Sequence, residues 1–204
     1  IPLRLVGSEM CIRDRASYLS TNANKRSMTL NLQSAEGREV LKKLAAGADV
    51  VFENFRPHTM DKLGLGYAVL KEINPRLVYC AVSGFGQDGP LAQRPAYDQI
   101  IQGFSGLMDL TGKPGDGPTR VGYTVCDATS AINAALAVLA ALLRARSSGI
   151  GAMIDVSMLD TTLTLGSWLV SGFLNAGAVP HPMGNQNHSA VPSGSFQTKE
   201  GLLN

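Results

Sequence analysis

The distribution of apolar and polar residues along the chain predicts strands that alternate with helices. Residues 28–32 alternate apolar and polar side chains, which is typical of a strand. Ser34 then offers an N-cap for a helix, and Gly47 closes that helix. The short apolar run at residues 50–52 predicts a strand that is buried on both faces. The first part of the chain therefore follows the order strand, helix, strand.

The same alternation continues to about residue 175. Further helices are predicted for residues 61–73, 97–108, a segment begun by Asp127, and 159–175, and further strands for residues 77–82 and 153–157. The helix over residues 61–73 stops at Asn74-Pro75, because the residue before a proline is disfavoured in a helix. Strands that alternate with helices imply βαβ units and a parallel sheet. We therefore predict an α/β fold, a Rossmann-like parallel sheet with flanking helices.

In such a sheet, ligands bind beyond the carboxyl ends of the strands. The turns at Asn54 and Gly84 and the segment before Asp127 lie at such ends, so we expect the binding site there. Two loops rich in glycine and proline, at residues 83–90 and 111–118, flank the helix predicted for residues 97–108.

Changes in composition predict the domain boundaries. From about residue 177 the chain is rich in Gly, Pro, Asn and His, so residues 16–189 are assigned to a large α/β domain and residues 190–204 to the start of a small domain. Residues 1–15 resemble one reading frame of a sequencing-library adapter, and we expect them to be non-native. We accordingly expect a chain truncated at both ends.

Composition excludes some classes of protein. The chain of 204 residues with 45% hydrophobic content can bury a sizeable core, and a net charge of +2 gives no general attraction to nucleic acid or a membrane surface. The apolar stretch at residues 131–143 is shorter than the roughly 20 residues that span a bilayer, so we expect a buried helix. Cys11, Cys80 and Cys126 lack metal-ligand spacing, as do the three histidines. We expect a cytoplasmic protein without a metal.

Common catalytic motifs are absent or incomplete. The chain has no nucleophile-elbow serine and no phosphate-binding P-loop. Gly84, Gly86 and Gly89 have the spacing of a dinucleotide-binding turn, but Pro90 follows and no helix begins there.

Asp127 is the most informative polar residue, because it stands where a loop meets the longest apolar run. By spacing alone it is an N-cap whose side chain bonds the backbone of Thr129 or Ser130. A helix N-terminus also favours an ionised carboxylate and stabilises nearby oxyanions, which suits a nucleophile. Its neighbour Cys126 is better explained as a small buried residue than as a rival nucleophile.

Seven ordered motifs resemble family III CoA-transferases, the group of formyl-CoA transferase and the carnitine CoA-transferases. They lie in register at residues 24–27, 48–57, 63–67, 74–79, 83–90, 95–98 and 105–108. The resemblance implies that Asp127 is the nucleophile. It would attack an acyl-CoA, form an anhydride and then an aspartyl-CoA thioester, and pass CoA to a carboxylic acid.

The resemblance also implies which residues hold CoA, which acts here as a substrate. The matching positions for the cofactor are Leu30, Asn31 and Gln33 at the adenine and phosphate end, Asn54, Phe55 and Arg56 along the molecule, and Lys62, Arg94, Tyr97 and Asp98. Lys62 replaces a family arginine, and Arg94 stands beside Pro95, where some members have a lysine. For Lys62 and Arg94 a solvated surface charge is the alternative.

Two alternatives to the transferase stay open. Alpha-methylacyl-CoA racemases share the fold and the aspartate, but they transfer a proton with the help of a histidine partner. Tyr97 occupies the position of that histidine in this chain. A phenol with a pKa of about 10 is poorly suited to proton transfer at neutral pH. The other alternative is a non-catalytic CoA-binding fragment. The family forms interlocked homodimers, and we expect this chain by itself to be inactive or poorly soluble. The motifs at residues 84–90 and 105–108 favour dicarboxylic substrates.

Overall fold

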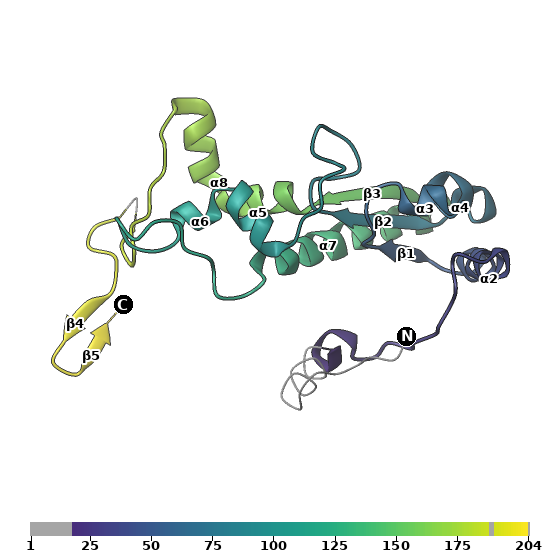
Figure 1. The fold of residues 1–204 in the computed structure, drawn as a ribbon, viewed down its shortest axis with the longest axis horizontal. Helices are drawn as coiled ribbons and strands as arrows, with labels where there is room; N and C mark the ends of the chain where they lie inside the picture. Colours follow the sequence, from purple (N-terminus) through teal and green to yellow (C-terminus); the bar gives the residue numbers. More distant parts are fainter. Residues whose placement is uncertain (1–17, 188–189, 204) are drawn as a thin grey trace. The chain divides into compact units, whose positions relative to one another are not determined.

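The computed structural model describes residues 18–187 and 190–203, which belong to two compact units divided after Leu32 (Figure 1). The predicted non-native residues 1–15 lie outside the described residues. In the first unit, residues 18–22 are helical and residues 25–31 have no regular secondary structure. The strand predicted for residues 28–32 is wrong. Met28 is exposed, and no described strand pairs with this segment.

A three-stranded parallel sheet is the centre of the second unit. Its strands are β1 (Val50–Glu53), β2 (Val78–Ser83) and β3 (Ala152–Ser157), in the order β1-β2-β3. Cys80 of β2 lies opposite Phe52 on one side and Ile154 on the other, so the three strands end at the same edge of the sheet. The predicted α/β class, a parallel sheet with flanking helices, is confirmed.

The strands differ in burial. Every residue of the central strand β2 is buried. Among the described strands, β1 pairs with β2 alone, and the side chain of Phe52 is 54% exposed. The prediction that residues 50–52 are buried on both faces is therefore wrong, because strand order, which local sequence does not encode, puts β1 at an edge.

Helix α2 (Ala35–Ala46) begins and ends as predicted. The Ser34 side chain accepts a hydrogen bond from the Gly37 backbone N–H at 3.0 Å, which satisfies one free amide of the first turn. Gly47 is the C-cap, and its N–H donates to the last turn. Both boundaries are read correctly because the capping contacts are local in sequence.

Two predicted helices are each divided by glycine. The helix predicted for residues 61–73 is split into α3 (Thr59–Lys62) and α4 (Tyr67–Ile73), and the one predicted for residues 97–108 into α5 (Asp98–Phe104) and α6 (Leu107–Leu110). Gly64 has a φ of 68° and Gly106 a φ of 76°, in the left-handed region that stops a helix and that glycine adopts without strain.

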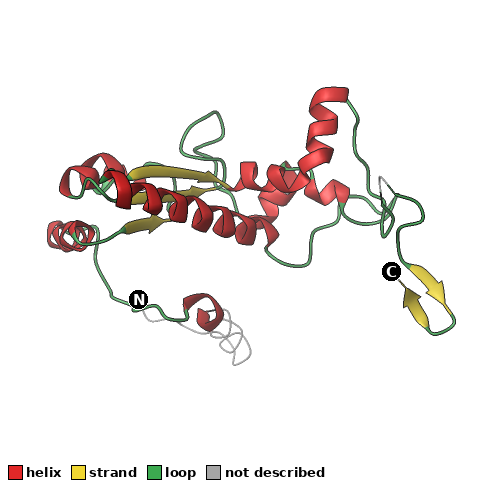
Figure 2. Ribbon diagram, turned by 180° about the vertical axis from the view of Figure 1, so that it is seen from behind, coloured by secondary structure: helices red, strands yellow, loops and turns green. Residues whose placement is uncertain are grey.

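Two long helices complete the unit. Helix α7 (Val125–Ser148) packs along β2 and β3, and Figure 2 shows it running beside the sheet. It ends at Gly149, which has a φ of 74°. Helix α8 (Met158–Ala176) packs against α7 and is interrupted at Ser167.

Helix α7 is less buried than predicted. A stripe of large apolar side chains at heptad-like spacing, which we call the α7 stripe, is 60–70% exposed: Ile132, Leu136, Leu139 and Leu143. By length and composition α7 could also cross a membrane, which is weak evidence because core helices meet the same criteria. The expectation of a buried helix therefore holds for only one face, on which Ala134 is fully buried.

The main apolar core joins the sheet to three helices. It contains Cys80, Val82, Ile101, Cys126, Ala134, Val156 and Met158. These side chains come from β2, β3, α5, α7 and the start of α8, so the core holds these five elements against one another. A separate antiparallel hairpin is formed by β4 (Phe196–Thr198) and β5 (Gly201–Leu203). The boundary near residue 190 stays a prediction.

Candidate active site

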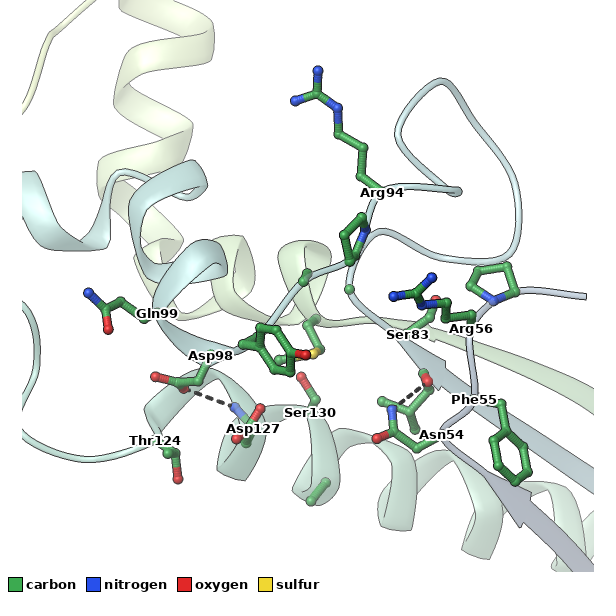
Figure 3. Close-up of a pocket in the computed structure, with 18 of the residues that line it drawn as sticks. Asn54, Phe55, Arg56, Ser83, Arg94, Asp98, Gln99, Thr124, Asp127 and Ser130 are labelled. Carbon is green, nitrogen blue, oxygen red and sulfur yellow. Dashed lines mark hydrogen bonds between the residues drawn. The ribbon is translucent and has the colours of Figure 1, made fainter. Parts of the chain in front are cut away.

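A cavity of about 700 Å³ opens at the carboxyl ends of β1 and β2 (Figure 3). It is lined by Phe52, Asn54, Phe55, Arg56, Pro57, Val82, Ser83, Gly84, Arg94, Pro95, Ala96, Tyr97, Asp98, Gln99, Arg120, Thr124, Asp127, Ser130, Ala131 and Met158. This is the edge of the sheet at which a parallel α/β fold binds its ligands.

The turn after β1 forms one wall of the cavity. The Asn54 side-chain amide donates to the Val82 carbonyl oxygen at 2.7 Å, which ties this turn to the end of β2. The backbone N–H of Phe55 donates to Glu53 Oε2 at 2.7 Å. These two bonds hold Phe55, whose side chain is 47% exposed, and Arg56 at the cavity.

Asp127 lies in the first turn of α7, but it is not the N-cap. Thr124 holds that position, and its side chain makes no capping bond. The carboxylate of Asp98, the first residue of α5, accepts the backbone N–H of Cys126 at 2.7 Å and of Asp127 at 3.3 Å. The prediction that Asp127 caps its own helix through the backbone of Thr129 or Ser130 is wrong, because α7 begins at Val125 and these two residues lie inside the helix.

Asp98 belongs to a buried polar network. Its side chain is 6% exposed, and Gln102, one turn further along α5, is fully buried. Gln102 Nε2 donates to Asp98 Oδ2 at 2.6 Å, and Gln102 Oε1 accepts the Val121 N–H at 2.9 Å. Gln102 Nε2 also lies 3.4 Å from the Tyr123 carbonyl oxygen. The network therefore fixes both the start of α7 and residues 121–123, which lead into it.

The pKa of the Asp127 carboxyl is raised above its ordinary value. Desolvation by the surrounding protein is the larger cause, and the negative charge of Asp98 is the second. The raised pKa is opposite to the lowering expected of a helix N-terminus, because burial and the charge of Asp98 outweigh that effect.

Cys126 is unsuited to attack a substrate. Its side chain is fully buried, as expected from the sequence, and burial raises the pKa of its thiol. It packs in the core that carries α7. Asp127, by contrast, lines the cavity.

Two serines, Ser83 and Ser130, line the cavity. Ser130 Oγ donates to the Cys126 carbonyl oxygen at 2.7 Å and lies 2.8 Å from Thr161 Oγ1. Ser83, at the end of β2, is 5% exposed, and its hydroxyl has no hydrogen-bond partner among the described residues. A buried hydroxyl without a partner is available to a ligand.

The structure brings together most of the residues that the sequence predicts for the site. Those that line one cavity are Asn54, Phe55, Arg56, Arg94, Tyr97, Asp98 and Asp127. Figure 3 shows Asp98 beside Asp127, whereas the side chain of Arg94 is directed away from them.

The remaining predicted residues are not among those that line it. Lys62 lies on α3, and Gln33 precedes the cap of α2. Leu30 and Asn31 belong to the first unit. The roles of all these residues in binding stay predictions.

Other lining residues were missed, namely Ser83, Gln99, Arg120, Thr124, Ser130 and Met158. Their type and local spacing carry no signal, because tertiary packing alone places them together. Gln102 also was missed, although a signal existed: residues four apart on a helix, such as Asp98 and Gln102, lie on one face.

Known proteins resemble this chain in both fold and sequence. A structure of a CAIB/BAIF family protein from Brucella suis superposes with a TM-score of 0.81 and 38% identity, covering 89% of this chain and 48% of that one. The sequence model described as CoA-transferase family III matches residues 2–204. The chain therefore belongs to CoA-transferase family III.

Two curated relatives are CoA-transferases by name. The chain is 41% identical to an acetyl-CoA:oxalate CoA-transferase of Acetobacter aceti, over 93% of this chain and 49% of the relative. It is 38% identical to a succinate–glutarate CoA-transferase of Agrobacterium fabrum, over 92% of this chain and 47% of the relative. The chain spans about half the length of these relatives.

Proposed function

We propose that the protein transfers CoA from an acyl-CoA donor to a carboxylic acid, with Asp127 as the nucleophile. The observation that carries this proposal is the place of Asp127: it lines the cavity at the carboxyl ends of β1 and β2, its carboxylate accepts no hydrogen bond from a described residue, and it lies in the first turn of α7. A carboxylate with a raised pKa is also a stronger nucleophile once it is ionised.

The first half of the reaction loads CoA onto the protein. An Asp127 oxygen attacks the thioester carbonyl carbon, the carbon–sulfur bond breaks, and CoA leaves as a thiolate. The thiolate then attacks the Asp127 carbonyl carbon of the resulting anhydride. The donor acid leaves as a carboxylate that carries one of the original Asp127 oxygens, and an aspartyl-CoA thioester remains.

The second half repeats these steps in reverse. The acceptor carboxylate attacks the aspartyl carbonyl carbon and expels the thiolate, which then attacks the acceptor carbonyl carbon of the new anhydride. The products are the acceptor acyl-CoA and free Asp127. No net proton is consumed, so the nucleophile needs to be ionised but needs no general base.

The residues around Asp127 suit the substrates. Asn54, Phe55, Arg56 and Arg94 are proposed to contact CoA, together with Leu30, Asn31, Gln33 and Lys62. Arginines suit the CoA phosphates and substrate carboxylates, since a guanidinium can bind two oxygens of either group. The names of the relatives support dicarboxylic acids as the acceptor class.

The racemase alternative is less well supported by the site. Tyr97, which stands where a racemase histidine would lie, is 75% exposed, and no histidine lines the cavity among the described residues. We also propose that the intact protein acts as an interlocked homodimer, as the family resemblance implies.

Oxygen-isotope transfer tests the proposed function. The intact protein is incubated with succinyl-CoA and a dicarboxylic acceptor labelled with heavy oxygen in its carboxylates. The mechanism moves one labelled oxygen into Asp127, where peptide mass spectrometry detects it, and hydroxylamine converts the thioester into an Asp127 hydroxamate. Asp127→Asn should abolish both, with a loss of turnover on the order of 1,000-fold or more.

Asp160→Asn is the matched control, because Asp160 also lies in the first turn of a helix but does not line the cavity. It should behave as the unaltered protein. Exchange of the substrate alpha proton in deuterated water, without label in Asp127, would instead establish the racemase-type reaction.

A further inference from the structure

We propose that Asp98 is a positioning residue that caps α7 in place of Asp127 and thereby leaves the Asp127 carboxylate free to attack the substrate. This inference rests on the proposed function of Asp127. It assigns Asp98 a role through the helix, not a contact with CoA.

The first argument is competition for the helix amides. The free N–H groups at a helix start attract a carboxylate in the first turn, and Thr124 leaves them uncapped. Asp98 Oδ1 accepts two of them, those of Cys126 and Asp127. Because these donors are already bound, the side chain of Asp127 is not held against its own backbone.

The second argument is that Asp98 is itself held. Both of its oxygens are engaged, Oδ1 by the amides of α7 and Oδ2 by Gln102 Nε2 at 2.6 Å. Gln102 also binds Val121, which lies 19 residues away in sequence. A buried pair with this many partners has one low-energy arrangement, so it fixes where α7 begins.

The third argument is electrostatic. The buried charge of Asp98 contributes to the raised pKa of Asp127. The other titratable or charged groups that line the cavity are Tyr97 and Asp98 at the start of α5, Arg94 before it, Arg56 after β1 and Arg120 before α7, and Cys126 is adjacent in sequence. Asp98 is the group among them that contacts the Asp127 backbone.

Exchanging the charge between Asp98 and Gln102 tests the proposal. In Asp98→Asn, the new amide group faces Gln102 Nε2, so two donors meet. In the double variant Asp98→Asn with Gln102→Glu, the amide instead donates to the new carboxylate, which still accepts the Val121 N–H. The double variant thus restores the bonds to residue 98 and to Val121, loses the weak one to the Tyr123 carbonyl oxygen, and moves the negative charge one turn along α5.

Three results are expected in the intact protein. Turnover falls on the order of 100-fold in Asp98→Asn, as for a misplaced reactive group, and recovers to within about 10-fold of the unaltered protein in the double variant. The acid limb of the kcat/KM pH profile moves to lower pH in both variants. Carbon NMR of aspartate-labelled protein, measured without substrate, should show that the titration midpoint of Asp127 is lower in both variants than in the unaltered protein.

Asp109→Asn, an exposed aspartate of α6, is the control for the substitution itself and should change none of these quantities. The proposal is overturned if Asp98→Asn keeps its turnover and titration midpoint. It is also overturned if two results occur together. The turnover of Asp98→Asn falls only in proportion to the folded fraction measured by circular dichroism, and the double variant regains the stability of the unaltered protein but not its turnover.

Failure of the proposed function gives a different result. In that case the unaltered protein itself incorporates no label at Asp127, while the NMR titration still reports the effect of Asp98 on its neighbour.

Discussion

At the scale of single residues, the carboxylates of this site are distinguished by what surrounds them. Asp98 is buried with both oxygens bonded, the Asp127 carboxylate accepts no hydrogen bond from a described residue, and Glu53 accepts the Phe55 N–H in the turn after β1. The same side-chain chemistry therefore serves as a cap in Asp98, as the proposed nucleophile in Asp127 and as a structural acceptor in Glu53.

Glu53 gives a prediction about pH and stability. Burial raises the pKa of its carboxyl, which accepts bonds from the Phe55 N–H and the Tyr79 hydroxyl. With the folded pKa above the unfolded one, the folded state binds the proton more tightly. The stabilising contribution is present below the unfolded pKa, about 4.3, and is lost as the pH rises through the raised folded pKa.

Glu53→Gln removes this ionisation while keeping an acceptor for the Phe55 N–H. Urea unfolding between pH 4 and pH 7 should show the variant gaining stability relative to the unaltered protein as the pH rises. Glu72→Gln, at an exposed residue of α4, should show no such trend. A constant difference between the two proteins across this range would contradict the assignment.

At the scale of elements, boundaries set by local contacts were predictable and those set by distant contacts were not. The Ser34 cap and the Gly47 stop of α2 lie next to the helix that they bound. The cap of α7 comes from Asp98, separated by 28 residues from the amide that it binds, and no local spacing signals such a contact. The site was predictable where strand ends pointed to it, as at Asn54, and not where packing assembled it, as at Arg120.

The predicted burial of α7 failed for a related reason. Periodicity identifies an apolar face, but it does not say whether this chain covers that face. The α7 stripe is as apolar as a core, but the described residues of this chain leave it exposed.

Paired leucine substitutions measure this difference between elements. Leu70 of α4 is fully buried, so Leu70→Ala should lower the free energy of unfolding by about 2–5 kcal/mol. Leu139 in the α7 stripe is 60% exposed, so Leu139→Ala should cost within about 0.5 kcal/mol in this chain. Chemical denaturation compares the two, and a cost for Leu139→Ala as large as that for Leu70→Ala would show that the stripe is covered in solution.

At the scale of the whole molecule, the second unit depends on a close approach between the starts of two strands. The Gly151 N–H donates to the Pro75 carbonyl oxygen at 2.8 Å, and the Arg144 guanidinium donates to the Gly151 carbonyl oxygen at 2.9 Å. A Cβ atom at Gly151 would meet the backbone carbonyl of Leu77. This residue therefore joins α7, β2 and β3 where no side chain fits.

Gly151→Ala should consequently lower the thermal midpoint and cost about 2 kcal/mol or more, since the obstacle is backbone and cannot rotate away. Gly47→Ala is the matched control, because Gly47 has a φ of −109° and nothing within 4 Å of the new atom. The control should change stability by less than about 0.5 kcal/mol. Equal midpoints for the two variants in a calorimetric scan would refute the close approach.

The segment that leads into α7 combines an exposed stretch with fixed ends. An exposed stretch of it is anchored at both ends: the Thr111 hydroxyl donates to the Leu107 carbonyl oxygen at 2.8 Å, and the Thr119 N–H donates to the Met108 carbonyl oxygen at 2.7 Å. Between these anchors, residues 113–118 are exposed. We expect substitutions in this stretch to alter the rim of the cavity near Arg120 while Asp98 and Asp127 keep their places. Under the proposed function, substrate selectivity can then change without a change at the nucleophile.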